Sequence, residues 1–299
     1  MFYSVIIVKT LPLYSQCLRI RKENHMKKKH IRVFIFICCM ATILGTYLYL
    51  YFQSKKAQSS SSDAFLLHET TAIYTTAPIT VPTPTVFQTE KTDTIYSFSQ
   101  GPKSWKKKKH WSGSWCNLIL DGNIFGSFGC GFCCMANIYS TLSDYECSPV
   151  DIYKCAKKVS SYHPSPGIGA IDWDGLEETL NYCGFTTSLH TKTLDYSDFQ
   201  NDIKQSSATI LLVSSQYDDS FWKNTPGHYV TIWNYNSDKD TVFLSDSGDP
   251  KRNRKTISLK TAYDALKMIS SSQYLTVSSY EEENNNWKWN QISEEWVAP

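Results

Sequence analysis

One uninterrupted apolar segment constrains this chain more than any other feature of its sequence. Residues 33–52 (VFIFICCMATILGTYLYLYF) contain neither a charged residue nor a proline. Twenty helical residues span about 30 Å, the thickness of the hydrocarbon core of a bilayer. A helix that is apolar on every side is typical of a membrane span, with a buried core helix as the alternative. We therefore expect residues 33–52 to form one transmembrane helix.

The charges that flank this segment indicate its orientation. Residues 1–32 carry eight basic residues and one acid, Glu23, so this head has a net charge of +7. Because the net charge of the whole chain is +2, the remaining residues carry −5. The positive-inside rule places such a head in the cytoplasm and all later residues outside the cell membrane. If the segment were instead a cleaved signal peptide, the remainder would be secreted, but signal cores are shorter, at about 7–15 apolar residues. Because the later residues are acidic overall, nucleic-acid binding is not indicated.

The composition changes again after the apolar segment. Ser, Thr and Pro supply 18 of the 42 residues in 53–94, which contain neither Gly nor Cys. Such a stretch buries too little apolar surface to offset the entropy of ordering it, so we expect a spacer. Residues 95–278 read as a globular domain. Residues 279–299 form an acidic, aromatic tail, to which the sequence assigns no function.

Within residues 95–278, helical patterns precede strand patterns. Residues 130–142 have helical periodicity, and Ser148 and Asp172 are helix-capping residues before further helices. Later segments alternate like strands, and a short turn at 236–240 joins two of them into a hairpin. Helices followed by hairpin-linked strands predict an α+β fold with an antiparallel sheet. The expected strands are 208–214, 228–235, 241–245 and 273–279, with a helix at 258–269 before the last.

Cys130 is the first candidate for chemistry. It lies in SFGCGFCCMA, where a Gly-rich loop turns into the helix of residues 130–142. Backbone N–H groups and the dipole at a helix N-terminus favour an anion, so they lower the pKa of a thiol placed there. A thiolate nucleophile needs this setting. A small buried cysteine or half of a disulfide is the alternative.

Three other residues supply the remaining roles of acyl transfer by a thiolate. His228 begins an apolar strand in PGHYVTIWNY, and Asp246 ends the next strand across the hairpin. Adjacent antiparallel strands can hold a carboxylate against an imidazole and fix its orientation. Gln100, in QGPKSW, carries an amide that can donate to an oxyanion. Asp249, in DSGDP, is a second candidate for the carboxylate.

In these motifs the chain resembles C39-type and C39-like cysteine peptidases of the papain-like superfamily. The matching motifs are FSQGPKSW, IFGSFGCGFCCMANIYSTL, PGHYVTIWNYN and VFLSDSGDP, in this order within residues 98–278. The resemblance implies a papain-like fold and hydrolysis of a peptide or protein substrate without cofactor or metal. It also implies that Cys130 attacks, that His228 and Asp246 complete the triad, and that Gln100 and the Cys130 N–H bind the oxyanion.

The sequence departs from the family pattern at three places. Phe132 stands where relatives usually have Pro, and Cys133 where Ser or Thr is common. The family aspartate is often followed directly by Pro, whereas Ser247 and Gly248 follow Asp246 here. The transporter-fused members process peptide leaders inside the cell, and this chain has no transporter region, so leader processing is not a firm expectation.

Other functions remain open at this level. Cys130 and Cys133 form a C-x-x-C pair at a helix start, as in thioredoxin-like oxidoreductases, although no apolar strand precedes it. A fold without activity that binds a ligand is another reading. Zinc binding is weakly supported, since Cys147 and Cys155 do not form a second C-x2-C pair. Six body cysteines besides Cys130 allow up to three disulfides outside the cell, and a Cys130–Cys133 disulfide would silence the nucleophile.

A run of four lysines follows Gln100 closely. The segment WKKKKHW extends from Lys106 to Lys109 between tryptophans. Such a run is either a solvated loop or a contact with an anionic surface or substrate.

Overall fold

The computed structural model describes residues 92–215 and 221–299. The predicted head, transmembrane helix and nearly all of the predicted spacer lie outside the described residues. Among those described, no helix combines the length and the apolar character that a bilayer crossing requires. The described residues belong to one compact unit of the chain.

Helices fill the first half of this unit, as the sequence predicts. The predicted helix at 130–142 is present with the same bounds. Ser148 caps the next helix in a capping box, because its hydroxyl accepts from the Asp151 N–H while the Asp151 carboxylate accepts from the Ser148 N–H. Asp172 caps the third by accepting from the Gly175 N–H. The helices are α2 (Pro102–Lys106), α3 (Phe125–Phe128), α4 (Cys130–Leu142), α5 (Pro149–Val159) and α6 (Trp173–Tyr182), with short 3-10 turns at Thr92–Thr94 and Ser114–Asn117 and a small β1–β2 hairpin (Ile119–Leu120, Asn123–Ile124) among them.

The second half is a six-stranded, wholly antiparallel sheet, which confirms the predicted α+β class. Its spatial order is β3-β8-β4-β5-β6-β7. Successive side chains of the central strands point to opposite faces of the sheet, as in any β-strand. Its strands are β3 (Cys183–His190), β4 (Ala208–Val213), β5 (His228–Asn236), β6 (Thr241–Ser245), β7 (Lys255–Ser258) and β8 (Tyr274–Asn285), and α7 (Tyr196–Lys204) and α8 (Leu259–Asp264) lie between them in sequence.

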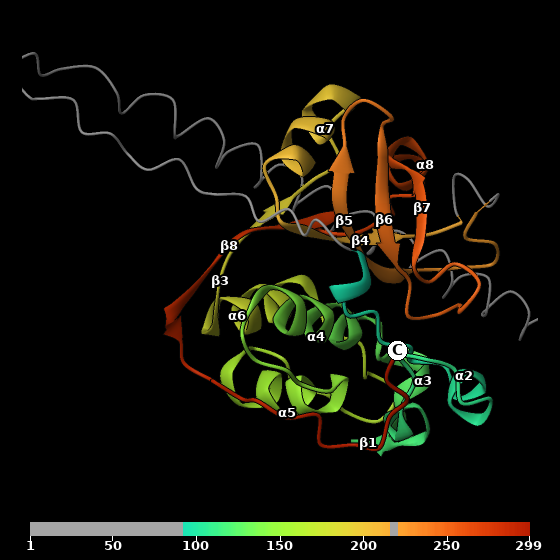
Figure 1. Cartoon of the computed structure of the whole chain (residues 1–299), viewed down its shortest axis with the longest axis vertical. Coiled ribbons are helices and arrows are strands. Elements are labelled where there is room, and N and C mark those ends of the chain that lie inside the picture. Colours follow the sequence, from blue (N-terminus) through green and yellow to red (C-terminus); the bar gives the residue numbers. More distant parts are fainter. Residues whose placement is uncertain (1–91, 216–220) are drawn as a thin grey trace, which may run out of the picture. The chain divides into compact units, whose positions relative to one another are not determined.

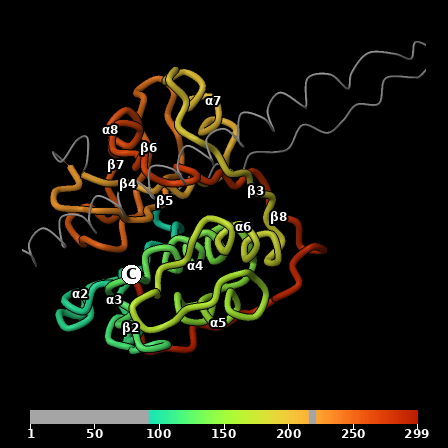
Figure 2. Tube along the Cα trace, turned by 180° about the vertical axis from the view of Figure 1, so that it is seen from behind, coloured from blue at the N-terminus to red at the C-terminus, as the bar shows by residue number. Residues whose placement is uncertain are grey.

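The sheet separates two hydrophobic cores. On one face, Leu212 and Trp233 pack with the residues of α4, α5 and α6. On the other face, Val213 and Ile232 pack with residues of α7 and α8. Both views show this order of layers, with α4–α6 on one side of the sheet and α7 and α8 on the other (Figures 1 and 2). Helix α4 therefore packs on the sheet face that includes β5, the strand that begins with the predicted histidine.

The structure differs from the predicted elements in three ways. The helix after Ser258 ends at Asp264 rather than at 269, because the chain then runs beside β4, where Leu266 forms a bridge with Val213. The last strand continues to Asn285, so the predicted domain boundary at 278 falls inside β8. The sequence patterns also missed β3, α7 and β7.

The acidic tail packs against the domain instead of leaving it. The ring of Trp296 lies 5.9 Å from that of Trp111 and 5.7 Å from that of Phe98. The Val297 N–H donates to the Ser112 carbonyl, and the Trp111 N–H donates to Val297. The end of the chain thus braces the segment that follows Gln100.

Candidate active site

Cys130 is the first residue of α4, and it differs from the other described cysteines in being partly exposed. Close packing holds the start of the helix in place. A Cβ on Gly131 would come within 2.6 Å of Ile171, and one on Gly129 within 2.4 Å of the Phe125 ring. Both glycines have negative φ here, so they are required for close approach of neighbouring groups rather than for a left-handed turn.

His228 and Asp246 meet across β5 and β6. His228 begins β5, Asp246 directly follows β6, and the two strands are neighbours in the sheet. The His228 Nε2–H donates to Asp246 Oδ1 at 2.9 Å. Asp246 is fully buried and His228 is 8% exposed. The pairing occupies Nε2, which leaves Nδ1 as the ring nitrogen available to the thiol.

The Asp246 carboxylate is held by several donors. Arg252 Nε donates to its Oδ2 at 2.8 Å, and Trp222 Nε1 donates to the same oxygen at 3.1 Å. The Gly248 N–H donates to Oδ1 at 2.9 Å. Burial raises the pKa of Asp246, but the hydrogen bond and charge of His228, with the charge of Arg252, outweigh burial and hold this pKa well below its usual range.

Asp249 has a different partner. Its carboxylate pairs with Arg252 Nη1 at 3.3 Å, whereas Asp246 pairs with the imidazole. Of the two aspartates that the sequence offers, the structure therefore brings Asp246 to His228. Arg252 bridges the two carboxylates.

Cys130 and His228 are neighbours and shift each other's pKa in opposite directions, and the Cys130 thiol donates to the Phe128 carbonyl at 3.8 Å. Burial opposes ionisation of the Cys130 thiol, but the hydrogen bond and charge of His228 and the N–H groups of Tyr229 and Gly131 outweigh it and lower the pKa of the thiol. Burial likewise disfavours the imidazolium, yet Asp246 and Cys130 raise the pKa of His228 from 6.5 to about 10. The site thus favours a thiolate–imidazolium pair.

Gln100 is tied to the same group of loops. Its Oε1 accepts from the Ser247 hydroxyl at 2.8 Å, and its backbone N–H donates to the Ser247 carbonyl at 2.9 Å. Its Nε2 donates one hydrogen to the Gly126 carbonyl at 3.1 Å. An amide nitrogen carries two hydrogens, so this fixed orientation leaves the second for another acceptor.

The structure separates Cys130 from the cysteines beside it. Cys133 and Cys134 are buried, and burial raises the pKa of both thiols well above the usual value. All seven cysteines in the described residues are free, so none of the disulfides that the sequence permits is present among them. Within the same residues, no cluster of three or more His, Cys, Asp and Glu side chains could hold a metal.

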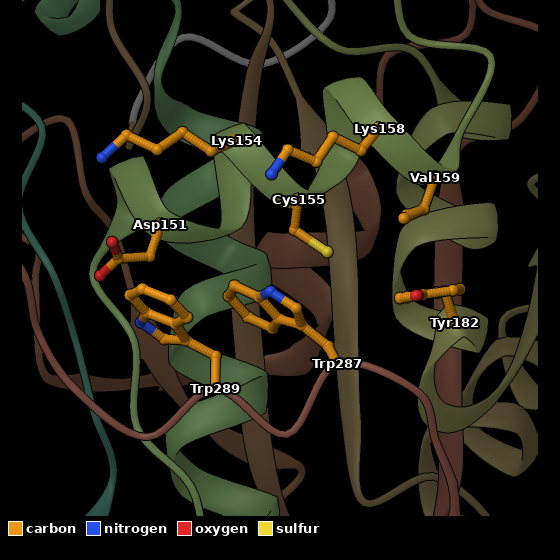
Figure 3. A pocket seen from close by; sticks show the side chains of 8 residues that line it. All are labelled: Asp151, Lys154, Cys155, Lys158, Val159, Tyr182, Trp287 and Trp289. Atoms are coloured by element: carbon orange, nitrogen blue, oxygen red, sulfur yellow. The ribbon is translucent and has the colours of Figure 1, made fainter.

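Two pockets differ in their relation to this site. One, of about 700 Å³, lies between the segment that follows Gln100 and the loop that follows Ser247. The other, of about 480 Å³, is not adjacent in sequence to Gln100 or Asp246 (Figure 3). None of the four predicted site residues is among the lining residues of either pocket. The second pocket lies between α5 and two tryptophans of the tail, whose rings stack 6.0 Å apart. The lining of this second pocket is Asp151, Lys154, Cys155, Lys158, Val159, Tyr182, Trp287 and Trp289.

Three residues at the site were not predicted. Arg252 and Trp222 hold the Asp246 carboxylate, and Ser247 orients the Gln100 amide. A buried ionised carboxylate requires a charged or hydrogen-bonding partner. Arg252, six residues after Asp246 in the sequence, could have been predicted as that partner. Trp222 carries no comparable signal in the sequence.

Comparison with known proteins adds no assignment. No protein-family model matches the chain, and a search of characterised proteins found no significant match.

Proposed function

We propose that this chain is a cysteine peptidase with a papain-like arrangement of Cys130, His228, Asp246 and Gln100. The contact between Cys130 and His228, with its lowered thiol pKa and raised imidazole pKa, is the observation that carries this proposal. An ordinary structural cysteine does not have such a partner. The other described cysteines whose pKa shifts are resolved all have raised values.

The reaction follows from the order of these groups. The Cys130 thiolate attacks the carbonyl carbon of a peptide bond and forms a tetrahedral oxyanion. The second hydrogen of Gln100 Nε2 and the backbone N–H of Cys130 stabilise that oxyanion. His228 then gives its proton to the leaving amine, and the C–N bond breaks. Water, deprotonated by His228, attacks the thioester, which releases the acid and restores Cys130.

Asp246 acts by positioning. Its hydrogen bond from Nε2–H fixes the ring with Nδ1 toward the thiol and stabilises the imidazolium. Arg252 and Trp222 keep the carboxylate ionised and in place.

The dithiol alternative fits the site less well. A thioredoxin-like pair would use Cys133 as the partner of Cys130, but Cys133 is buried and its pKa is raised. The residues before Cys130 form α3 and not a strand. A redox role would also leave His228, Asp246 and Gln100 without a purpose.

We further propose that residues 33–52 anchor the peptidase in the membrane with its domain outside. The basic head and the uncharged apolar segment support this topology. In intact cells, an added protease should digest the domain while an epitope on the N-terminus stays protected. Protection of both ends would overturn this topology.

A peptide electrophile that reacts with thiolates tests the proposed chemistry. We expect the full-length protein to be labelled at Cys130 and to cleave peptides, and Cys130→Ala to lose both properties. Cys133→Ser is the matched control and should retain both. Peptide binding without turnover or labelling would identify a binding module instead. Loss of activity in Cys133→Ser with intact folding would favour a dithiol oxidoreductase.

A further inference from the structure

The pocket beside Gln100 is adjacent to the proposed active site. One wall begins at Gly101, the residue after Gln100, and the other begins at Gly248, two residues after Asp246. A Cβ on Gly248 would lie 3.0 Å from Nε2 and Cε1 of His228, so this wall lies against the imidazole. The pocket therefore borders the edge of the imidazole that carries Nε2 and Cε1.

The walls of this pocket carry an excess of positive charge. Lys103, Lys107 and Lys109 line one side, and Lys251 lines the other. In the part of the chain that the structure describes, none of these four forms an ion pair. The single acid in the lining, Asp249, is already paired with Arg252.

A turn of the backbone after α2 brings lysines of the run to this pocket. Helix α2 ends after Lys106, and Lys108 has a positive φ of 48°, so the chain turns there. The Lys109 N–H then donates to the Ser104 carbonyl, which folds the segment back on α2. The turn places Lys107 and Lys109 at the pocket, while Lys108 instead pairs with Glu295 of the tail at 3.3 Å.

Unpaired lysines around a pocket favour an anionic ligand. The position of the pocket indicates which part of a peptide substrate would carry the negative charge. His228 protonates the leaving amine, so the residues after the scissile bond lie on the imidazole side of the site. Gly248, against that ring, belongs to the lysine-lined wall.

We propose that this pocket binds acidic side chains in the substrate, Asp or Glu, within the first few residues after the scissile bond. This inference rests on the proposed peptidase function and adds the substrate class. It also gives the lysine run after Gln100 a specific role, in place of a solvated loop or a contact with an anionic surface.

Paired internally quenched peptides test the preference. Each pair differs only in Glu or Gln after the scissile bond, and a second set carries the same exchange before it. We expect full-length protein to cleave the Glu peptide about tenfold faster by kcat/KM in the first set, as for a few exposed ion pairs. The second set should show little difference. Added salt should reduce the preference, because the lysines are exposed.

Variants locate the preference. The double variant Lys107→Gln/Lys251→Gln should bring the Glu-to-Gln ratio close to one, with folding checked by thermal unfolding. The matched control Lys204→Gln/Lys239→Gln removes the same charge from α7 and from the β5–β6 turn and should keep the wild-type ratio. An equal loss in the control variant would mean that net charge, and not the pocket, sets the preference, which overturns the inference.

Binding to an inactive protein separates this inference from the proposed function. Fluorescence polarisation with Cys130→Ala should show tighter binding of the Glu peptide than of the Gln peptide, and the Lys107→Gln/Lys251→Gln change should abolish the difference. Cleavage without any charge preference would overturn the pocket assignment alone. If no peptide is cut, the peptidase proposal fails, and the polarisation measurement decides what the pocket binds.

Discussion

The described residues contain two histidine–aspartate pairs, and these differ in burial, in geometry and in what lies beside them. His228 and Asp246 are buried and joined by a 2.9 Å hydrogen bond, and Cys130 lies beside the imidazole. His190 and Asp202 lie 3.4 Å apart at the edge of the sheet, with side chains 27% and 32% exposed. The His190 ring stacks on Tyr274 at 4.7 Å.

The comparison shows what an imidazole needs beyond a carboxylate. Asp246 is fixed by Arg252 and Trp222, so it can hold the ring in one orientation. The second nitrogen of His228 is available to a thiol at a helix N-terminus, whereas His190 Nε2 is hydrogen-bonded to Thr276 at 2.9 Å. Of these two pairs, only the first therefore combines a fixed ring with a neighbouring thiol.

Replacing each histidine gives the largest expected contrast. His228→Ala should lower kcat/KM for peptide cleavage on the order of 10³-fold or more, because it removes both the partner of the thiolate and the proton donor. His190→Ala should leave cleavage within about twofold, since an exposed pair outside the site contributes little. Steady-state kinetics on both variants measures the difference, and equal losses would contradict a special role of His228.

Replacing the two aspartates should give a smaller contrast. Asp246→Asn should reduce kcat by about 10²–10⁴-fold while the fold persists, because an amide no longer fixes the imidazole tautomer. Asp202→Asn should have almost no effect on kcat. Asp249→Asn, which alters the pairing with Arg252 and the hydrogen bond from the Lys251 N–H, should retain most of the activity. If Asp249→Asn were the more damaging change, the assignment of Asp246 would be wrong.

The pH dependence of labelling and of cleavage should follow the shifted pKa values of Cys130 and His228. The pKa of Cys130 is lowered, so the alkylation rate should rise with pH below the usual thiol range. The pKa of His228 is raised to about 10, so cleavage should decline as the pH rises through that value and the imidazolium is lost. Asp246→Asn should move the alkaline decline to lower pH. A cleavage profile without an alkaline limb would rule out the imidazolium as the proton donor.

A stability measurement gives the smallest expected effect. Arg252→Gln removes one of the two charged partners of the buried Asp246 carboxylate and should lower the free energy of unfolding by about 1–3 kcal/mol. Lys157→Gln breaks a more exposed pair with Asp121 and should cost about 0–1 kcal/mol. Urea unfolding of both variants tests the difference. Equal costs would indicate that Arg252 does not anchor the site.

Local patterns were sufficient for the central elements. Helix α4 has the predicted bounds because its apolar residues recur with helical spacing. Strand β6 also has the predicted bounds, because a turn of polar residues marks where it begins. Helix α7 was missed because only Phe199 and Ile203 of its nine residues are buried, although Asp195 caps it. Strand β3 was missed because Gly184, with a φ of +89°, and register shifts interrupt its alternation.

The site was predictable to the extent that chemistry restricts residue types. Cys130, His228, Asp246 and Gln100 could be named from motifs, and the structure places them around one set of loops. Their supports depend on tertiary contacts. Nothing local to Trp222 indicates that its indole N–H reaches Asp246, and Lys108 and its partner Glu295 in the tail are 187 positions apart.

The position of Cys130 at the start of α4 has a consequence for how the protein is made. The thiol belongs to the helical half, and the imidazole that activates it begins a strand in the later half. Until β5 has paired within the sheet, Cys130 has no such neighbour and behaves as an ordinary protonated cysteine. If Cys130 acts as the nucleophile that we propose, its reactivity is therefore acquired only on completion of folding.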